Sequence, residues 1–233
     1  MSILSRAAMF VSRSLFLYGC TELRLGTNVA TAIHFVATFV LASRGAPYLA
    51  LPFLAVVLCY VATRSYALIP YALLLASIPG VWFAVSRFIV DLALGMQCDP
   101  LSYASIYLVF VLGALNTLYV LHATNLSELC YVVTKLTKSR ELGLAPYLLW
   151  RVASKIFKDV SEMLYAHRLK GVEVWKSLGM TFVWGEEVSK LFTEGLLLKA
   201  PLFRAKAIYS RRALALQSLV LLLDTVSILL STR

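Results

Sequence analysis

Long apolar runs separated by short polar turns fill the first half of the chain, and one more apolar run lies near its end. Crossing the hydrocarbon of a bilayer takes about 20 apolar residues, with roughly 17 as the lower limit. Five windows of this kind occur, at 27–43, 47–63, within 66–96, at 102–122 and at 213–230. The pattern therefore predicts five principal transmembrane helices.

Turn residues mark the ends of these windows. Arg44-Gly45-Ala46-Pro47 lies between the first two windows and predicts a tight helical hairpin, and Cys98-Asp99-Pro100 introduces the fourth. The run 66–96 is too long for one straight span, and Pro79-Gly80 is a place to kink or break it. We expect there a span together with a short re-entrant or interfacial helix.

Two arginines seven residues apart interrupt the apolar residues ahead of the first window. Arg6 and Arg13 would share one face of a helix, which predicts an interfacial helix at the membrane surface. Because no long uninterrupted apolar core follows, residues 1–19 do not resemble a secretory signal and are expected to stay in the mature protein.

Between the fourth and fifth windows the pattern becomes amphipathic. Asn125 followed by Glu128 has the form of a capping box and predicts a helix that runs to about Thr137. Gly143 and Pro146 are then expected to interrupt the helical pattern.

Two longer amphipathic helices are predicted beyond this interruption. Across 149–167, apolar residues recur at i, i+3, i+4 and i+7 with basic residues opposite them, and Gly171 is expected to end the helix. A second amphipathic stretch covers 182–207, in which Glu186 and Lys190 have the spacing of a stabilising ion pair.

The composition identifies a membrane protein with a local basic surplus. Hydrophobic residues make up 60% of the chain and charged residues only 15%, which exceeds the apolar share of a soluble domain. Residues 124–212 contain 15 of the 22 basic and 8 of the 12 acidic residues, a net charge of +7. The positive-inside rule places this block in the cytoplasm and, four crossings earlier, the N-terminus as well. Nucleic acid is therefore not an expected partner.

We expect an all-α fold, namely a polytopic membrane helical bundle with long amphipathic cytoplasmic helices. Three regions are predicted: 1–122, a membrane region with the interfacial helix and about four spans; 123–212, the cytoplasmic amphipathic region; and 213–233, the C-terminal transmembrane helix. The expected location is the cell membrane, with multiple crossings.

Little in the sequence indicates catalysis. The Walker, G-x-S-x-G and H-E-x-x-H patterns are absent, so we expect no enzyme activity in this chain, no cofactor and no metal site. Asp91 follows Arg87 by one turn and predicts a local ion pair, whereas Asp224 in the last window is either functional or a paired structural group. His34 is expected to make a polar contact between helices. Four scattered cysteines are expected to be buried thiols: Cys20, Cys59, Cys98 and Cys130.

Two short basic segments carry the most specific signal. They are Ala166-His167-Arg168-Leu169-Lys170-Gly171 and Ala207-Ile208-Tyr209-Ser210-Arg211-Arg212. Here the chain resembles the transmembrane T component of energy-coupling factor (ECF) importers, the CbiQ/EcfT family, whose signatures are of the type Ala-Gln-x-Ala-Arg-Gly and Ala-Met-x-Ala-Arg-Gly. Lys170 and Arg211 occupy the two arginine places, 41 residues apart. The segments 121–129 and 142–146 extend the resemblance over residues 100–230.

The resemblance implies a coupling subunit of an ABC importer. Such a subunit transmits ATP-driven motion from two cytoplasmic ATP-binding cassette ATPase subunits to a membrane (S) subunit that binds a vitamin or a transition metal ion, and ATP hydrolysis belongs to the partners. The amphipathic helices would be its coupling helices. The implied ATPase-coupling residues are Ala166, His167, Arg168, Lys170, Gly171, Ala207, Ser210, Arg211 and Arg212.

The chain departs from the family pattern at several places. Lys170 stands where the family has arginine, Ser210 where it has alanine, and Arg212 where it has glycine. Lysine keeps the charge at Lys170 but loses the planar fork that binds carboxylates through two hydrogen bonds.

Two other classes of function remain open from the sequence. A membrane-embedded enzyme of lipid or isoprenoid metabolism would use Asp91, Asp99 and Asp224 with a metal ion. A membrane scaffold with a cytoplasmic helical domain would need no ATPase partner.

Overall fold

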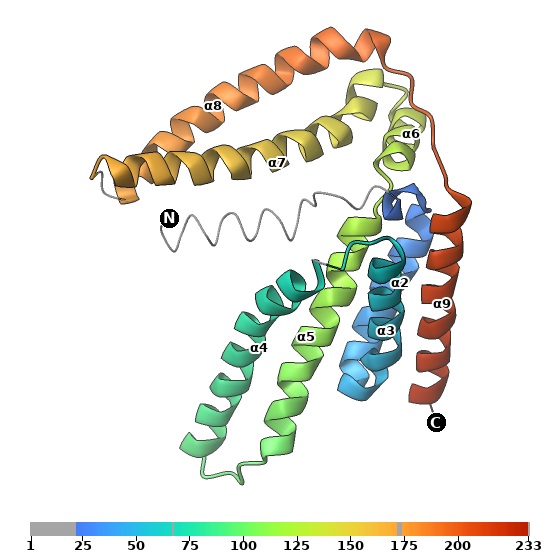
Figure 1. Ribbon diagram of the computed structural model, residues 1–233, viewed down its shortest axis with the longest axis vertical. Helices are drawn as coiled ribbons and strands as arrows, with labels where there is room; N and C mark the ends of the chain where they lie inside the picture. The colour runs from blue at the N-terminus through green and yellow to red at the C-terminus, as the bar shows by residue number, and fades with distance from the viewer. Residues whose placement is uncertain (1–21, 67, 172–173, 233) are drawn as a thin grey trace. The chain divides into compact units, whose positions relative to one another are not determined.

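The computed structural model describes residues 22–66, 68–171 and 174–232, and within these ranges the chain is helical with no strand (Figure 1). The elements are η1 (Leu23–Leu25), α2 (Asn28–Arg44), α3 (Ala46–Ala62), α4 (Leu68–Ala93), α5 (Pro100–Ala123), α6 (Leu126–Thr137), α7 (Arg140–Leu169), α8 (Val174–Lys199), η2 (Ala200–Leu202) and α9 (Arg211–Ser231). The predicted interfacial helix at 1–19 lies outside the described residues.

The elements form two compact units. Residues 125–208 make up one, here called the amphipathic unit, which contains α6, α7, α8 and η2. The described residues before 125 and after 208 make up the other, here called the membrane unit, which contains η1, α2 to α5 and α9.

Three helices of the membrane unit are long and apolar enough to cross a bilayer. They are the Ala76–Ala93 part of α4, the whole of α5 and the whole of α9. α2 and α3 have 17 residues each, which at 1.5 Å per residue is about 25 Å, and α3 is the more apolar of the two. Helices therefore occupy all five predicted windows, and three of them have the length and composition of a membrane span.

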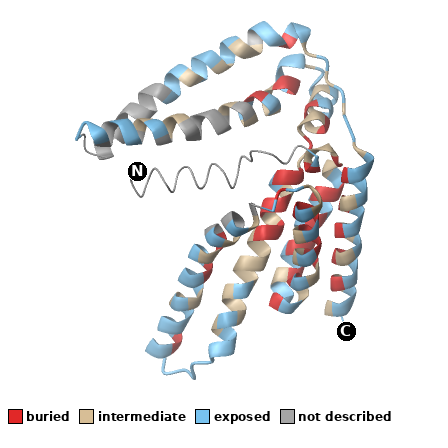
Figure 2. Cartoon of the chain, in the orientation of Figure 1, coloured by how far each residue is buried: buried red, intermediate tan, exposed pale blue. Residues whose placement is uncertain are grey.

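The membrane unit has an apolar core and an apolar outer surface. Leu41, Leu49, Val56, Leu115 and Val220 are buried between helices. Many other large apolar side chains are exposed instead, and Figure 2 draws the exposed stretches of the helices in pale blue. Examples are Phe39, Leu54, Trp82, Leu101 and Leu222. An exposed apolar surface on long apolar helices is the arrangement expected where lipid is the solvent.

The expected break at Pro79-Gly80 does not occur. α4 continues through Pro79 from Leu68 to Ala93, so the separate re-entrant or interfacial helix was a wrong prediction. A proline removes one backbone donor, and α4 keeps its helical course along α5 despite this loss. Gly80 lies against Tyr107 and Phe110 of α5, and its lack of a side chain permits this close approach.

The expected interruption at Gly143 and Pro146 is also absent. α7 begins at Arg140 and runs through both residues. Gly143 serves packing instead, since a Cβ atom there would lie 2.9 Å from Cβ and 3.2 Å from Cα of Thr134 on α6. Buried Leu144 and Leu148 hold the same stretch of α7. Tertiary packing thus outweighs the local preference of glycine and proline for turns.

The second amphipathic helix has different ends from those predicted. α8 covers Val174–Lys199 rather than 182–207, and η2 follows it. Pro201 lies just past the end of α8, a common place for proline. Residues 203–210 have no helical structure before α9 begins at Arg211.

The predicted N-cap of α6 is confirmed. The Asn125 side chain accepts hydrogen bonds from the backbone N–H groups of Ser127 and Glu128, at 3.0 and 3.1 Å, and α6 ends at Thr137 as expected. Asp99 caps α5 in the same way. Gly45, with φ of +119°, makes the tight reversal between α2 and α3.

Candidate functional site

The first basic segment forms the end of α7. The N–H of Lys170 donates to the carbonyl of Ala166 at 3.3 Å, and Gly171 takes a left-handed conformation with φ of +69° that ends the helix, as predicted. The Lys170 side chain is exposed and makes no ion pair or hydrogen bond within the described ranges. The side chains of His167 and Arg168 lie outside the described residues. A lysine at a helix C-terminus also interacts favourably with the helix dipole.

The second basic segment does not end an amphipathic helix. Ala207 and Ile208 belong to the extended stretch after η2, whereas Ser210 precedes α9 as its N-cap. The N–H of Ser210 donates to the carbonyl of Leu25 at 2.8 Å. The segment therefore joins the two units, and its C-terminal half is anchored in the membrane unit.

Arg212 has a structural role in this anchor. Its guanidinium donates to the carbonyl of Ala62 at 2.6 Å and forms an ion pair with Glu22 at 3.0 Å. Because the last carbonyls of a helix lack partners within that helix, Arg212 satisfies one at the end of α3. Arg211 is exposed and makes no side-chain contact of this kind among the described residues.

The stretch before α9 is also fixed to the amphipathic unit. The Asn125 side chain donates to the carbonyl of Ile208 at 2.9 Å, and the N–H of Ile208 donates to the Ser127 hydroxyl at 3.0 Å. The capping residue of α6 thus holds the chain just before it enters the membrane unit.

The acidic residues outside the basic block have separate roles. Asp91 forms the predicted ion pair with Arg87 at 3.1 Å and accepts from the hydroxyl of Tyr103 at 3.0 Å. Asp99 caps α5, and Asp224 pairs with His34. In the part of the chain that the structure describes, no three His, Cys, Asp or Glu side chains come together as metal ligands do. The three aspartates are therefore not brought together as a metal-dependent enzyme would need.

His34 and Asp224 form a buried pair between α2 and α9. Nδ1 of His34 lies 2.8 Å from Oδ2 of Asp224, and both side chains are almost completely buried. The predicted polar contact of His34 is confirmed, and Asp224 is its partner. Nε2 of His34 and Oδ1 of Asp224 are buried without a hydrogen bond to any described group.

Further buried polar side chains continue from this pair. The ring of Tyr119 on α5 stands edge to face with His34, with centroids 5.3 Å apart, and also with Tyr60 on α3 at 6.3 Å. The hydroxyl of Tyr60 is hydrogen-bonded to Nδ1 of His122. The sequence pattern alone did not predict that Tyr60, Tyr119 and His122 lie together. The signal was present on α5, where Asn116, Tyr119 and His122 recur every three residues on one side of the helix.

Gln217 joins α9 to the start of α2. Its amide oxygen accepts from the N–H of Thr27 at 2.8 Å, and its amide nitrogen donates to the carbonyl of Thr27 at 3.3 Å. The first and last helices of the membrane unit are therefore joined at Thr27–Gln217 and at His34–Asp224.

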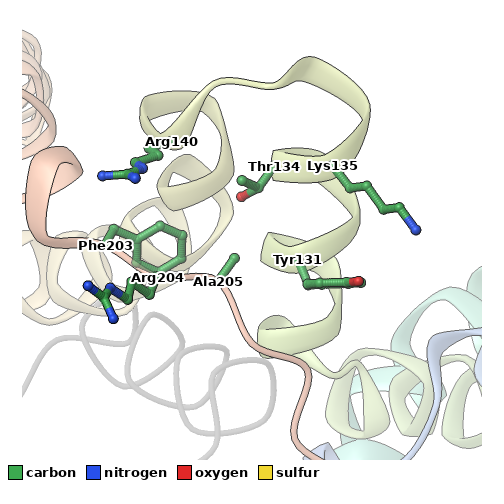
Figure 3. Close-up of a pocket in the computed structure, with 7 residues that line it drawn as sticks. All are labelled: Tyr131, Thr134, Lys135, Arg140, Phe203, Arg204 and Ala205. Atoms are coloured by element: carbon green, nitrogen blue, oxygen red, sulfur yellow. The ribbon is translucent and has the colours of Figure 1, made fainter.

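The amphipathic unit contains a pocket of about 260 Å³, shown in Figure 3. Its lining is Tyr131, Thr134, Lys135, Arg140, Phe203, Arg204 and Ala205. In this view Lys135 extends away from Arg140 and Arg204, so the basic groups do not converge on one point. Arg140 instead donates to the carbonyl of Pro201 at 3.1 Å, which joins the start of α7 to η2.

Comparison with known proteins found no relative of this chain. No protein-family model, curated protein or solved structure matches the chain.

Proposed function

We propose that this chain is the transmembrane coupling subunit of an ECF-type importer, with the N-terminus and residues 123–212 in the cytoplasm. It would transmit ATP-driven motion from two ATP-binding cassette ATPase subunits to a substrate-binding membrane subunit for a vitamin or a transition metal ion. The proposal rests on the resemblance of the two basic segments and on the structure of the amphipathic unit.

The observation that supports it best is the hairpin of α7 and α8. These helices have 30 and 26 residues, so α7 alone is about 45 Å long at 1.5 Å per residue. The hairpin turns next to the exposed Lys170. A long rigid helix with a basic end is suited to dock in an acidic groove of a partner and to carry the displacement of that partner to its other end.

The second segment supports the proposal in a different way. Through Ser210 and Arg212, it is bonded to η1 and to the end of α3. Arg211 is the cation of this segment that stays available to a partner. A force applied at Arg211 would act directly on α9, and through the Thr27–Gln217 bonds on α2.

The test is capture of the ATPases by the full chain purified in mild detergent. We expect wild type to co-purify two subunits with Walker motifs. Lys170→Glu and Arg211→Glu should each lower this capture by about tenfold to a hundredfold, since a hydrogen bond to a charged group contributes roughly 1.5–3 kcal/mol.

Lys190→Glu is the matched control. Lys190 is an exposed cation on α8 whose partner, Glu186, lies 3.0 Å away on the same helix, as predicted. Its charge reversal should leave capture at the wild-type level. The proposal fails if wild type captures no ATPase, or if the Lys170 and Arg211 variants bind as well as the Lys190 variant does. In cells, Arg211→Glu should abolish uptake of the cargo while the chain still inserts into the membrane.

A further inference from the structure

A continuous group of five titratable side chains crosses the inside of the membrane unit. All five residues are 2% exposed or less: His122, Tyr60, Tyr119, His34 and Asp224. Each contacts the next through a hydrogen bond or an edge-to-face ring contact. The group begins at the C-terminal end of α5 and leads to the middle of α9.

The buried pair at the inner end of this group lacks compensation for its charge. A neutral His34 bonded to an ionised Asp224 carries a net charge of −1. α3 and α5, which pack beside the pair, contain no lysine or arginine, and Arg211 and Arg212 lie at the distant start of α9. Burying an uncompensated charge is very unfavourable, so addition of one proton, which makes the pair neutral overall, is favoured.

The unpartnered atoms of the pair show where the proton can be held. Nε2 of His34 and Oδ1 of Asp224 have no hydrogen-bond partner within the described chain, and neither do the buried hydroxyls of Tyr119 and Ser227. A proton needs no cavity, unlike a metal ion or an organic ligand. Ionisable groups in membrane helices commonly serve as proton relays.

We propose that His34 and Asp224 form a proton-binding site between α2 and α9. One proton from water adds to the pair, which yields imidazolium hydrogen-bonded to carboxylate. No bond between heavy atoms changes. This activity is separate from ATPase coupling and does not rest on the ECF proposal.

Protonation would alter the contact between α2 and α9. Among the titratable groups, the ring of Tyr119 on α5 contacts His34, and Tyr60 on α3 and then His122 on α5 follow it. Cys59 lies on α3 and Arg24 on η1. Since α9 begins at the second basic segment, the protonation state of Asp224 would set how firmly the helix behind that segment is held.

The test uses the full chain in lipid nanodiscs with ¹⁵N-labelled histidine. The chain has only three histidines, so the His34 signal is assigned by its loss in His34→Gln. Between about pH 9 and about pH 4, which brackets the ordinary range of His and Asp, we expect His34 to gain a proton. In Asp224→Asn, whose side chain has nearly the same shape, His34 should stay neutral over most of this range because the carboxylate that favours imidazolium is gone.

Two further variants test the specificity. Tyr107→Phe on α5 and Asp99→Asn at the exposed cap of α5 should behave as wild type. The proposal is overturned if His34 does not change protonation in wild type, or if Asp224→Asn titrates like wild type.

Discussion

Replacement of Gly143 by alanine tests the contact that holds α7 to α6. The added Cβ would overlap the hydroxyl of Thr134, which donates to the carbonyl of Cys130, and would stand 2.9 Å from Cβ and 3.2 Å from Cα of the same residue, whereas carbon atoms prefer separations of about 3.5–4.0 Å. One of these atoms is backbone, so a change of side-chain rotamer cannot relieve the clash and the helices must separate by roughly 0.5 Å. Overpacking of this kind costs about 1–3 kcal/mol.

The helix propensity of alanine offsets part of this cost. Glycine in a helix interior is less favourable than alanine by roughly 0.5–1 kcal/mol. We therefore expect a net loss of about 1–2 kcal/mol of local stability, which is roughly a five- to thirtyfold rise in the population of the open state.

Hydrogen exchange of the full chain in nanodiscs measures this change directly. Backbone amides of α6 and of the first half of α7 should exchange faster in Gly143→Ala by that factor. The control is Gly195→Ala on α8, where no atom lies within 4 Å of the added Cβ and exchange should slow instead. Slower exchange in both variants would refute the packing argument and show that helix propensity alone decides.

Four other predictions rest on single residues. Asn125→Ala removes the cap of α6 and should cost about 1–2 kcal/mol, seen as faster exchange in the first turn of that helix; unchanged exchange would contradict the capping role. Gly26→Ala would place a Cβ on the side chain of Gln217 and should lower the thermal stability of the membrane unit, and equal melting temperatures would refute this. Exposed Cys98 should react with an impermeant maleimide added outside intact cells, with Cys98→Ser as the control, and labelling only after lysis would reverse the proposed topology. Burial raises the pKa of the Cys130 thiol, so its alkylation in nanodiscs should be slow at neutral pH and accelerate well above pH 9, because less thiolate is present at any lower pH; fast reaction at neutral pH would show that the thiol is not buried.

Features set by neighbouring residues were the ones that the sequence predicted well. The Asn125 cap, the Arg87–Asp91 pair and the Glu186–Lys190 pair each involve residues within four positions of one another. Their geometry follows from the helix itself, so the pattern of residues is sufficient to predict them.

Features that depend on packing were misread or missed. Pro79 looked like a break, but the neighbouring helix α5 supports α4 on both sides of it. The partner of His34 lies 190 residues away in the sequence, and no local pattern indicates which acidic residue it is. The role of Arg212 depends on the end of α3, which lies 150 residues away in the chain. The function proposed from the two basic segments stays a prediction.

The wide separation in sequence between His34 and Asp224 has a consequence for biogenesis. In the proposed topology, His34 would enter the membrane long before the ribosome reaches Asp224, so a nascent chain would hold an unmatched imidazole among lipids or other helices until its last helix is inserted. A chain truncated before α9 would keep that defect. Quality-control proteases that recognise exposed polar groups within the bilayer would therefore act on unfinished copies and spare finished ones.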